Sequence, residues 1–540
     1  MGCWRAYLGV YTRPMHRSFI RFAAAFAGSV VLGFAQAPAT PPASGFPAPP
    51  AIEKLQPTQH SIQVGGKTIA YTATAGTLVL KKDDSKPTAS IFFVAYTRDD
   101  AGDKSKRPVT FAFNGGPGSA SVWLHLGALG PRRVVLGPTG EQPPPPYRLV
   151  DNEDSLIEFT DLVFIDPVTT GYSRNAPGED PKQFHGLEGD LNSVADFISL
   201  YTGKFDRWSS PKFLAGESYG TTRAAGLSEV LLEKGIYLNG ITLISSVLNF
   251  ETISFSPGNE LPYILYLPTY TAAAWYHKKL PADLQRGTLE KAVQSARDFA
   301  GGDYTLALMK GSQLTPAERS KVAEQTARFT GLSKDYVEKS NLRVSIQRFR
   351  KELLRTEQRT IGRYDSRLEG TDIDSVGERP EYDASYASVQ GAFTATFNDY
   401  IRRELKWETD LNYEVLTDKV RPWSYEKQQN QYVNTGEMLR QAMAQNPNLH
   451  VLVANGFYDL ATPFFATEYT FSHLGLDPSL QGNVKLTYCD AGHMLYTSKA
   501  CLDSLRHSVE EFYGQVLSSS SASASSQPDL RRGAASGANR

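Results

Sequence analysis

The chain has 540 residues, of which 41% are hydrophobic and 21% are charged. This composition is ordinary for a globular protein, and the length is ample for one large core with an insertion or a second domain. The 56 basic and 57 acidic residues leave a formal net charge of -1. Because no overall field attracts nucleic acid or an anionic membrane, we expect neither as a partner, and small neutral or zwitterionic substrates stay open.

The N-terminus has the layout of a secretory signal. Arg17 and Arg21 precede an apolar stretch, which ends at the small-residue segment 35–37 (Ala-Gln-Ala). We expect residues 1–37 to be removed, with Met15 as an alternative start. The apolar run is shorter than the about 20 residues that span a bilayer, which disfavours a short membrane anchor. The sequence therefore predicts a secreted or periplasmic protein whose mature chain does not insert stably into a membrane.

Two further segments are low in complexity. Residues 38–60 include a run rich in Pro and Ala, and residues 518–540 are rich in Ser and Ala. Such segments cannot bury enough apolar surface to fold alone. We therefore expect a linker at 38–60 and a disordered tail at 518–540.

Short β-rich runs fill the segment after residue 60 and predict an antiparallel meander, because Gly or Asp-Asp-Ser separates them. They cover residues 61–66, 67–76, 77–85 and 89–99. Later runs are apolar on both faces, which is typical of strands in a covered parallel sheet. These lie at residues 109–113, 161–165, 212–215, 240–244, 450–454 and 484–488. The predicted fold class is α/β, with a meander leading into a mostly parallel sheet whose two core segments are 61–250 and 431–517.

Between residues 251 and 430 helical signals replace the β-rich runs. Thr315, Pro316 and Glu318 form a capping arrangement before a stretch that reaches Phe329, and Gly331 is a suitable end for this helix. Apolar residues recur at helical spacing in the next stretch, at Leu342, Ile346, Phe349, Leu353 and Leu354. Since this region interrupts the α/β pattern, we predict a mainly helical inserted cap at 251–430.

The strongest local motif is Gly216-Glu217-Ser218-Tyr219-Gly220, which follows a predicted strand and precedes a stretch of small residues. This is G-x-S-x-G in the strand-to-helix context that holds a serine hydroxyl above a sheet. The flanking glycines avoid clashes that side chains would cause in so tight a turn. We predict that Ser218 is a nucleophile, against the alternative of a purely structural turn.

A nucleophilic serine needs a base that takes its proton and an acid that orients that base. In α/β-hydrolases both follow the serine along the chain, the acid first. Four histidines are candidates for the base. His493 lies in a loop just past a predicted strand, whereas His450 begins a strand and His473 and His507 lie in apparent helices. The sequence therefore favours His493.

Two aspartates compete for the role of the acid. Asp459 follows the preceding strand closely, so it should lie at the same edge of the sheet as the histidine. Asp490 is only three residues from His493 and is better placed to cap that loop. The predicted triad is Ser218, Asp459 and His493.

A glycine-rich segment, Asn114 to Ser119 (NGGPGS), follows an early strand. In α/β-hydrolases the corresponding loop supplies half of the oxyanion hole. Consecutive glycines let a backbone N–H approach a developing oxyanion, and the second N–H comes from the residue after the nucleophile. We predict these groups to be the amides of Gly116 and Tyr219, against the alternative of a glycine turn without a ligand.

Four motifs in this order resemble those of the serine carboxypeptidases: an N-G-G-P-G-S loop, a G-E-S-Y-G elbow, an N-G-x-x-D segment and a G-H-M segment. Here they lie at residues 114–119, 216–220, 455–459 and 492–494, and residues 164–173 are also similar to the family. The resemblance covers about residues 105–250 and 445–500. It implies an α/β-hydrolase fold and a serine-type carboxypeptidase that acts on peptides without a cofactor.

By the same resemblance, Asn114 and Glu217 would hold the carboxylate at the C-terminus of the substrate. The family has a second glutamate some fourteen residues beyond the loop asparagine, where this chain has Ala128. It also has tryptophan and cysteine around the loop, where this chain has Ala112 and Ser119. These differences leave a serine esterase or acyltransferase open beside the carboxypeptidase.

Two other functions stay open at this stage: a serine esterase or acyltransferase with the same machinery, and a catalytically silent binding protein. The sequence has no HExxH or CxxC pattern that would predict a metal site, and it leaves the oligomeric state open. Cys489 and Cys501 are the cysteines left once Cys3 is removed. In an oxidising compartment we expect them to form a disulfide beside His493, with two buried free thiols as the alternative.

Overall fold

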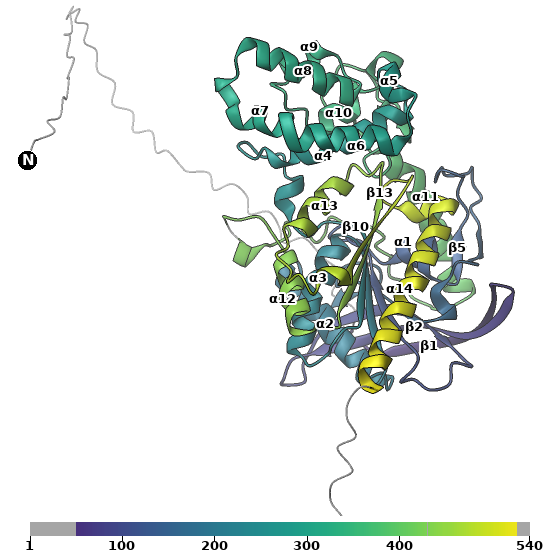
Figure 1. Ribbon diagram of the computed structural model, residues 1–540. Coiled ribbons are helices and arrows are strands. Elements are labelled where there is room, and N and C mark those ends of the chain that lie inside the picture. Colours follow the sequence, from purple (N-terminus) through teal and green to yellow (C-terminus); the bar gives the residue numbers. More distant parts are fainter. Residues whose placement is uncertain (1–49, 429, 526–540) are drawn as a thin grey trace, which may run out of the picture. The chain divides into compact units, whose positions relative to one another are not determined.

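A computed structural model describes residues 50–428 and 430–525, and Figure 1 traces them. Their centre is a ten-stranded sheet ordered β1-β2-β3-β7-β4-β9-β10-β13-β14, with β8 paired to β3. The strands are β1 (Lys54–Val64), β2 (Lys67–Lys81), β3 (Pro87–Arg98), β4 (Val109–Phe113), β7 (Asp161–Ile165), β8 (Arg174–Asn175), β9 (Lys212–Ser218), β10 (Gly240–Ser246), β13 (His450–Gly456) and β14 (Val484–Cys489). β1, β2 and β3 pair antiparallel, and β7, β4, β9, β10, β13 and β14 are parallel neighbours. The predicted sequence of a meander and then a parallel sheet is confirmed.

The meander has three strands, whereas the sequence predicts four. The runs at 67–76 and 77–85 form one long strand, β2, which passes through Gly76 without a turn. A Cβ at Gly76 would lie 2.8 Å from Leu55 Cδ2 and 2.9 Å from Phe93 Cζ, on the two neighbouring strands. Gly76 therefore marks a close approach of side chains across the strand, which sequence alone does not distinguish from a turn.

Alternate residues of the parallel strands pack into two hydrophobic clusters, one on each face of the sheet. In β4, Phe111 and Phe113 join one cluster and Ala112 joins the other. Helices α2 (Leu187–Lys204), α3 (Tyr219–Glu233) and α12 (Gly436–Gln445) contribute to the first cluster, and α1 (Val122–Leu124), α11 (Ala384–Arg403) and α14 (Lys499–Ser525) to the second (Figure 1). The strands β4, β7, β9, β10 and β13 are buried on both sides, as predicted, because both faces are covered. The edge strand β14 is an exception, because its residues are only partly buried.

The inserted region begins with a helical group that has its own core. It contains α4 (Leu261–Tyr276), α5 (Ala282–Gln285), α6 (Leu289–Phe299), α7 (Thr305–Lys310), α8 (Pro316–Thr330), α9 (Lys334–Lys339) and α10 (Ile346–Glu352). Helix α8 begins with the predicted capping box of Thr315 and Glu318, and it ends at Gly331 in the left-handed conformation. The next predicted helix is shorter than expected, because Leu342 lies before α10, although its five apolar residues are all buried.

The inserted region is not a separate cap throughout. Two small two-stranded sheets accompany the main sheet. β5 (Arg132–Val134) pairs with β6 (Leu149–Asp151) in the first core segment, and β11 (Thr360–Ile361) pairs with β12 (Glu369–Gly370) in the inserted region. After β12, α11 packs through Val389, Phe393 and Phe397 into the core of the main sheet. The apolar face of α11 belongs to the same cluster as α14, so only the part from α4 to α10 has its own core.

The predicted boundaries at both ends need correction. β1 begins at Lys54, so seven residues of the predicted linker are part of the sheet, where they pair with β2. α14 continues to Ser525 and includes the first part of the predicted disordered tail. The predicted signal at 1–37 and residues 526–540 lie outside the described residues. Within the part of the chain that the structure describes, no helix is long and apolar enough to cross a membrane.

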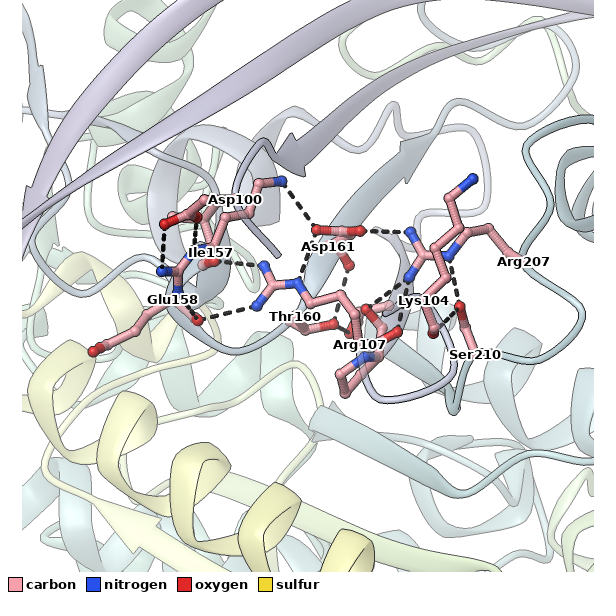
Figure 2. A network of polar contacts seen from close by, with 12 residues as sticks. Asp100, Lys104, Arg107, Ile157, Glu158, Thr160, Asp161, Arg207 and Ser210 are labelled. Atoms are coloured by element: carbon pink, nitrogen blue, oxygen red, sulfur yellow. Dashed lines mark hydrogen bonds and ion pairs between the residues drawn. The ribbon is translucent and has the colours of Figure 1, made fainter. Parts of the chain in front are cut away.

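A buried polar network holds the amino edge of the sheet, where Asp161 opens β7 (Figure 2). Arg107 Nε donates to Asp161 Oδ1 at 3.0 Å, and Arg207 Nη1 donates to Asp161 Oδ2. Both arginines also donate to backbone carbonyls, Arg107 to Ile157 at 2.6 Å and Arg207 to Arg107 at 2.9 Å. All three charged side chains are at most 8% exposed. The pairing compensates for burial of the charges and ties the starts of β4 and β7 together.

Replacing Asp161 with Ala would leave two buried guanidiniums without their shared carboxylate. Breaking a buried pair in this way costs about 3–5 kcal/mol, so we expect a clear fall in the urea midpoint of unfolding. Asp100→Ala is the control, because the Asp100 side chain, which pairs with Arg98, is 64% exposed, and surface pairs contribute little. Equal midpoints for the two variants would contradict a structural role for the network.

Candidate active site

Ser218 lies at the turn between β9 and α3, at the carboxyl edge of the sheet. Its φ is 60° and its ψ is −130°, a conformation that L-residues rarely adopt. The turn is held because β9 lies between β4 and β10 in the sheet, while α3 packs against the sheet directly after it. This is the strained strand-to-helix turn that the G-x-S-x-G motif predicts.

The glycine-rich loop after β4 packs directly against this turn. A Cβ at Gly115 would lie 2.3 Å from Tyr219 N and 2.8 Å from Gly220 N, so a larger residue cannot be accommodated there. Gly116 has a φ of +105° and lines the same pocket as Ser218. Tyr219 is the first residue of α3, where an N–H has no acceptor within its own helix. The predicted oxyanion amides, Gly116 and Tyr219, thus lie on two segments that are in contact.

The predicted base and acid are hydrogen-bonded to each other. His493 Nδ1 lies 2.8 Å from Asp459 Oδ2, and both side chains are buried. Asp459 Oδ1 accepts hydrogen bonds from the backbone N–H groups of Ala461 at 2.7 Å and Thr462 at 3.0 Å. An ionised carboxylate can only accept hydrogen bonds. The imidazole proton must therefore lie on Nδ1. Nε2 is then left to accept a proton from a hydroxyl in the pocket, which both Ser218 and His493 line.

The rival residues lie elsewhere. His450 begins β13 at the opposite edge of the sheet, and His473 and His507 are exposed on or next to helices. Asp490 is exposed, and its backbone carbonyl accepts a hydrogen bond from Arg367 Nη1 at 2.7 Å. The structure therefore brings together the three residues that the sequence selects.

Two hydroxyl groups that the sequence analysis missed also support the triad. Thr462 Oγ1 donates to Asp459 Oδ2 at 2.7 Å and lies 3.1 Å from His493 Nδ1. Ser245 Oγ donates to the backbone carbonyl of His493 at 2.5 Å. Thr462 follows Asp459 by three residues and could have been found as a turn residue. Ser245 lies inside β10, near its carboxyl end, and has no local signal.

Electrostatic effects on His493 oppose each other. Burial lowers the pKa of the imidazole, but the Asp459 carboxylate and, more weakly, Glu217 raise it, and the net pKa is above its usual value. The charged form is therefore favoured by its partners despite burial. An imidazolium, which a serine hydrolase forms when the serine is deprotonated, is stabilised here.

Glu217 lies beside His493 with its carboxyl group buried. Asn114 Nδ2 donates to Glu217 Oε2 at 2.8 Å, and His493 Nε2 lies 3.8 Å from Glu217 Oε1. Burial raises the pKa of the Glu217 carboxyl, and His493 and Asn114 act in the opposite direction. Glu217 lines the pocket, whereas Asn114 is fully buried behind it. The predicted contact of Asn114 with a substrate stays a prediction, while its amide already orients Glu217.

A buried ion pair holds the asparagine loop in place. Arg223 on α3 donates from Nε to Asp190 Oδ2 at 2.8 Å and from Nη1 to the carbonyl of Asn114 at 2.6 Å. Both charged side chains are at most 2% exposed, and burial raises the pKa of Asp190. The helix that follows the nucleophile therefore also positions the residue that orients Glu217.

The segment 363–367, between β11 and β12, is the other contribution that the sequence analysis missed. The Tyr364 ring stacks on the His493 ring, with centroids 5.1 Å apart and planes 14° apart. The Tyr364 carbonyl accepts the His493 backbone N–H at 2.5 Å, and the Arg363 carbonyl accepts that of Leu460 at 3.1 Å. The inserted region thus contacts both loops that carry the predicted acid and base.

The pocket above Ser218 is largely apolar away from its catalytic groups. It is lined by Gly115, Gly116, Ser119, Trp123, Glu217, Ser218, Tyr364, Tyr386, Leu416, His493 and Met494. Ser119 accepts a hydrogen bond from Trp123 Nε1 at 2.8 Å. Ala128 is buried in the hydrophobic core, so no second carboxyl group comes from that position.

Cys489 and Cys501 form a disulfide, with Cα atoms 5.9 Å apart. The bond joins the end of β14 to α14 across the loop that carries His493. This is the predicted pairing, and the single bond closes the loop that carries the predicted base, His493.

Comparison with known proteins gives the family. Residues 69–495 match the family model described as serine carboxypeptidase, which is most of the chain. The chain belongs to the serine carboxypeptidase family. It is 33% identical over 156 residues to the pheromone-processing carboxypeptidase KEX1 of Saccharomyces cerevisiae, a match that covers 27% of this chain and 20% of the relative. Serine carboxypeptidase-like 34 of Arabidopsis thaliana is 29% identical over 161 residues, which is 27% of this chain and 30% of that relative.

These matches span less than a third of each curated relative. Among solved structures, this chain resembles KEX1(delta)p, a prohormone-processing carboxypeptidase from Saccharomyces cerevisiae, with a TM-score of 0.50 and 17% identity. That comparison covers 82% of this chain and 91% of the other. The predicted α/β-hydrolase fold is confirmed.

Replacing Ser218, His493 or Asp459 with Ala should leave a folded protein without most of its turnover. For Ser218 and His493 we expect losses of about 10⁴-fold or more, because each acts in the same proton transfer. Turnover of an N-blocked dipeptide and circular dichroism of each variant check this expectation. His507→Ala, at an exposed helical position, is the control. Near-normal activity of Ser218→Ala would show that the nucleophile is assigned wrongly.

Proposed function

We propose that this protein is a serine-type carboxypeptidase that releases C-terminal residues from peptides through an acyl-enzyme on Ser218. The observation that carries the proposal is the buried carboxyl of Glu217, which lines the pocket directly beside the triad. A protonated carboxyl there can donate a hydrogen bond to the terminal carboxylate of a peptide. An ionised one would repel it.

In the proposed reaction Ser218 Oγ attacks the carbonyl carbon of the last peptide bond while His493 Nε2 takes its proton. The amides of Gly116 and Tyr219 stabilise the oxyanion that forms. His493 then gives the proton to the departing amino group, and the peptide remains as an ester on Ser218. Water, deprotonated by the same imidazole, hydrolyses the ester and restores the serine. Asp459 holds the tautomer of the imidazole and stabilises its charged form throughout.

Glu217 and His493 are close enough to titrate together. His493 Nε2 lies 3.8 Å from Glu217 Oε1, and each group affects the pKa of the other. Peptide acids need the form in which Glu217 holds a proton and His493 is neutral. This form belongs to the singly protonated pair, so it exists mainly between the two apparent pKa values. Amides and esters need only a neutral His493.

A serine esterase or acyltransferase is the second candidate. The observation that favours it is Ala128, since the resemblance implies a second glutamate there and this chain has no carboxyl at that position. A catalytically silent binding protein is disfavoured by the buried contact between His493 and Asp459 beside the nucleophile turn. Labelling of Ser218 by a fluorophosphonate probe separates the silent protein from the two enzymes.

We also propose that the protein is exported. The support is the signal-like layout of residues 1–37 in the sequence and the disulfide between Cys489 and Cys501, a bond that persists mainly in oxidising compartments. Cell fractionation with an antibody against the folded domain tests this, and a purely cytosolic signal would contradict it.

The test of function compares pH profiles of kcat/KM for an N-blocked dipeptide acid and its amide. For the acid we expect a maximum followed by a decline at higher pH, as Glu217 ionises. For the amide we expect a rise to a plateau as His493 becomes neutral. At the maximum the acid should be preferred by about 10-fold to 100-fold, the effect of one charge-assisted hydrogen bond of about 1.5–3 kcal/mol.

Glu217→Gln is the matched variant, because an amide can donate to a carboxylate at every pH. In this variant we expect the decline for the acid substrate to disappear. Loss of the nearby carboxylate should also lower the pKa of His493, so the amide profile should rise at lower pH. Parallel profiles for acid and amide in the wild type would refute the carboxypeptidase proposal and leave a general serine hydrolase.

A further inference from the structure

Tyr496 lies in a short turn, Leu495–Thr497, directly after the segment that carries His493. Its side chain is 2% exposed, and its hydroxyl donates to Glu217 Oε1 over 3.5 Å. Neither the triad nor the proposed oxyanion amides need this residue. Its hydroxyl is nevertheless aimed at the carboxyl group on which recognition of a free C-terminus depends.

The space that the tyrosine ring occupies is made by small residues. A Cβ at Gly127 would lie 2.6 Å from Tyr496 Cε2 and 2.8 Å from Tyr496 Cδ2, so a side chain at position 127 would displace the ring. Ala128, the next residue, is buried in the same hydrophobic cluster as Tyr496. The ring therefore lies against the backbone of the segment in which the family resemblance implies a second glutamate.

The Glu217 carboxyl is held from two sides. Asn114 Nδ2 donates to Oε2 at 2.8 Å, and the Tyr496 hydroxyl approaches Oε1. His493 Nε2 lies 3.8 Å from the same Oε1, so hydroxyl and imidazole face one oxygen. A donor on Oε1 fixes the rotation of the carboxyl and leaves Nε2 for the serine. His493 Nε2 can donate to Oε1 only in the charged form of the imidazole, so Tyr496 is the donor that remains when His493 is neutral.

We propose that Tyr496 is a positioning residue that orients the Glu217 carboxyl for recognition of a substrate's terminal carboxylate. This inference rests on the proposed carboxypeptidase function and deepens it. The tyrosine hydroxyl supplies the second contact to Glu217 in a chain that has Ala128 instead of an acid. Recognition of a peptide acid thus depends on one carboxyl group held by an amide and a phenol.

The charged and titratable groups around Glu217 give this arrangement a measurable pH dependence. They are His493 and Asp459 on the two triad loops, and Tyr364 on the inserted segment, besides Tyr496 itself. Burial raises the pKa of the Tyr496 hydroxyl well above its usual value, so it stays a donor throughout the working range. A donor stabilises ionised Glu217, so removing it should raise the pKa of that carboxyl.

The test is Tyr496→Phe, which removes only the hydroxyl and keeps the ring against Gly127. We expect the preference for a dipeptide acid over its amide to fall about 10-fold, through a higher KM for the acid and an unchanged kcat for the amide. The decline in kcat/KM for the dipeptide acid should also move to higher pH. Tyr400→Phe is the control, because Tyr400 is equally buried in the same cluster but its hydroxyl contacts Tyr96 at 2.9 Å.

A double-mutant cycle with Glu217→Gln tests whether Tyr496 acts through Glu217. Adding Tyr496→Phe to Glu217→Gln should then shift neither the preference for the acid nor its pH dependence. An unchanged preference and profile in Tyr496→Phe alone would overturn the inference while the wild-type profiles still support a carboxypeptidase. An equal loss in both backgrounds would also overturn it. Parallel acid and amide profiles in the wild type would instead refute the proposed function, and this inference with it.

Active-site labelling accounts for a variant that folds poorly. Fluorophosphonate labelling counts the fraction of each preparation that has a competent Ser218, so kcat/KM is compared per labelled site. A change in the number of sites alone leaves the ratio of acid to amide turnover unaltered. Such a result would mean that the hydroxyl serves packing only, which contradicts the inference.

Discussion

The active site depends on the close approach of two backbones, at Gly115 and Tyr219. The 2.3 Å that would separate a Cβ at position 115 from the Tyr219 amide leaves room for hydrogen alone. Because of this contact, the loop after β4 and the turn after β9 form one surface, although they are about a hundred residues apart in the chain. That surface places Gly116, Ser218 and Glu217 around one small pocket.

Polar contacts then extend from this surface into the interior. Asp190 pairs with Arg223, Arg223 donates to the carbonyl of Asn114, Asn114 donates to Glu217, and Glu217 faces His493. Each group is buried, so each is costly unless its neighbour satisfies it. Such a chain transmits geometry: a shift of one member leaves the next without its partner. At its end Glu217 and His493 are 3.8 Å apart, so the charge of each acts on the pKa of the other.

The inserted region also contacts the loops that carry the predicted acid and base. Its segment 363–367 stacks Tyr364 on His493 and binds the loop that carries Asp459 through the Arg363 carbonyl. The helices α4 to α10 have a separate core, yet that core includes Leu460, the residue next to Asp459. Both parts of the inserted region thus contact the segment around Asp459.

By itself the sequence predicted where the candidate catalytic residues lie relative to the strands. It predicted the nucleophile after one strand, the acid and the base after two later strands, and the glycine loop after an earlier one. Local rules suffice for this, because the elbow, the caps of α8 and the apolar runs depend on neighbours in the chain. Only the tertiary structure decided that Gly76 lies inside a strand, that α11 returns to the main core, and that Tyr364 and Tyr496 reach His493 and Glu217. The physical reason is that these are contacts between segments distant in the chain, set by packing of side chains that have no local pattern of their own.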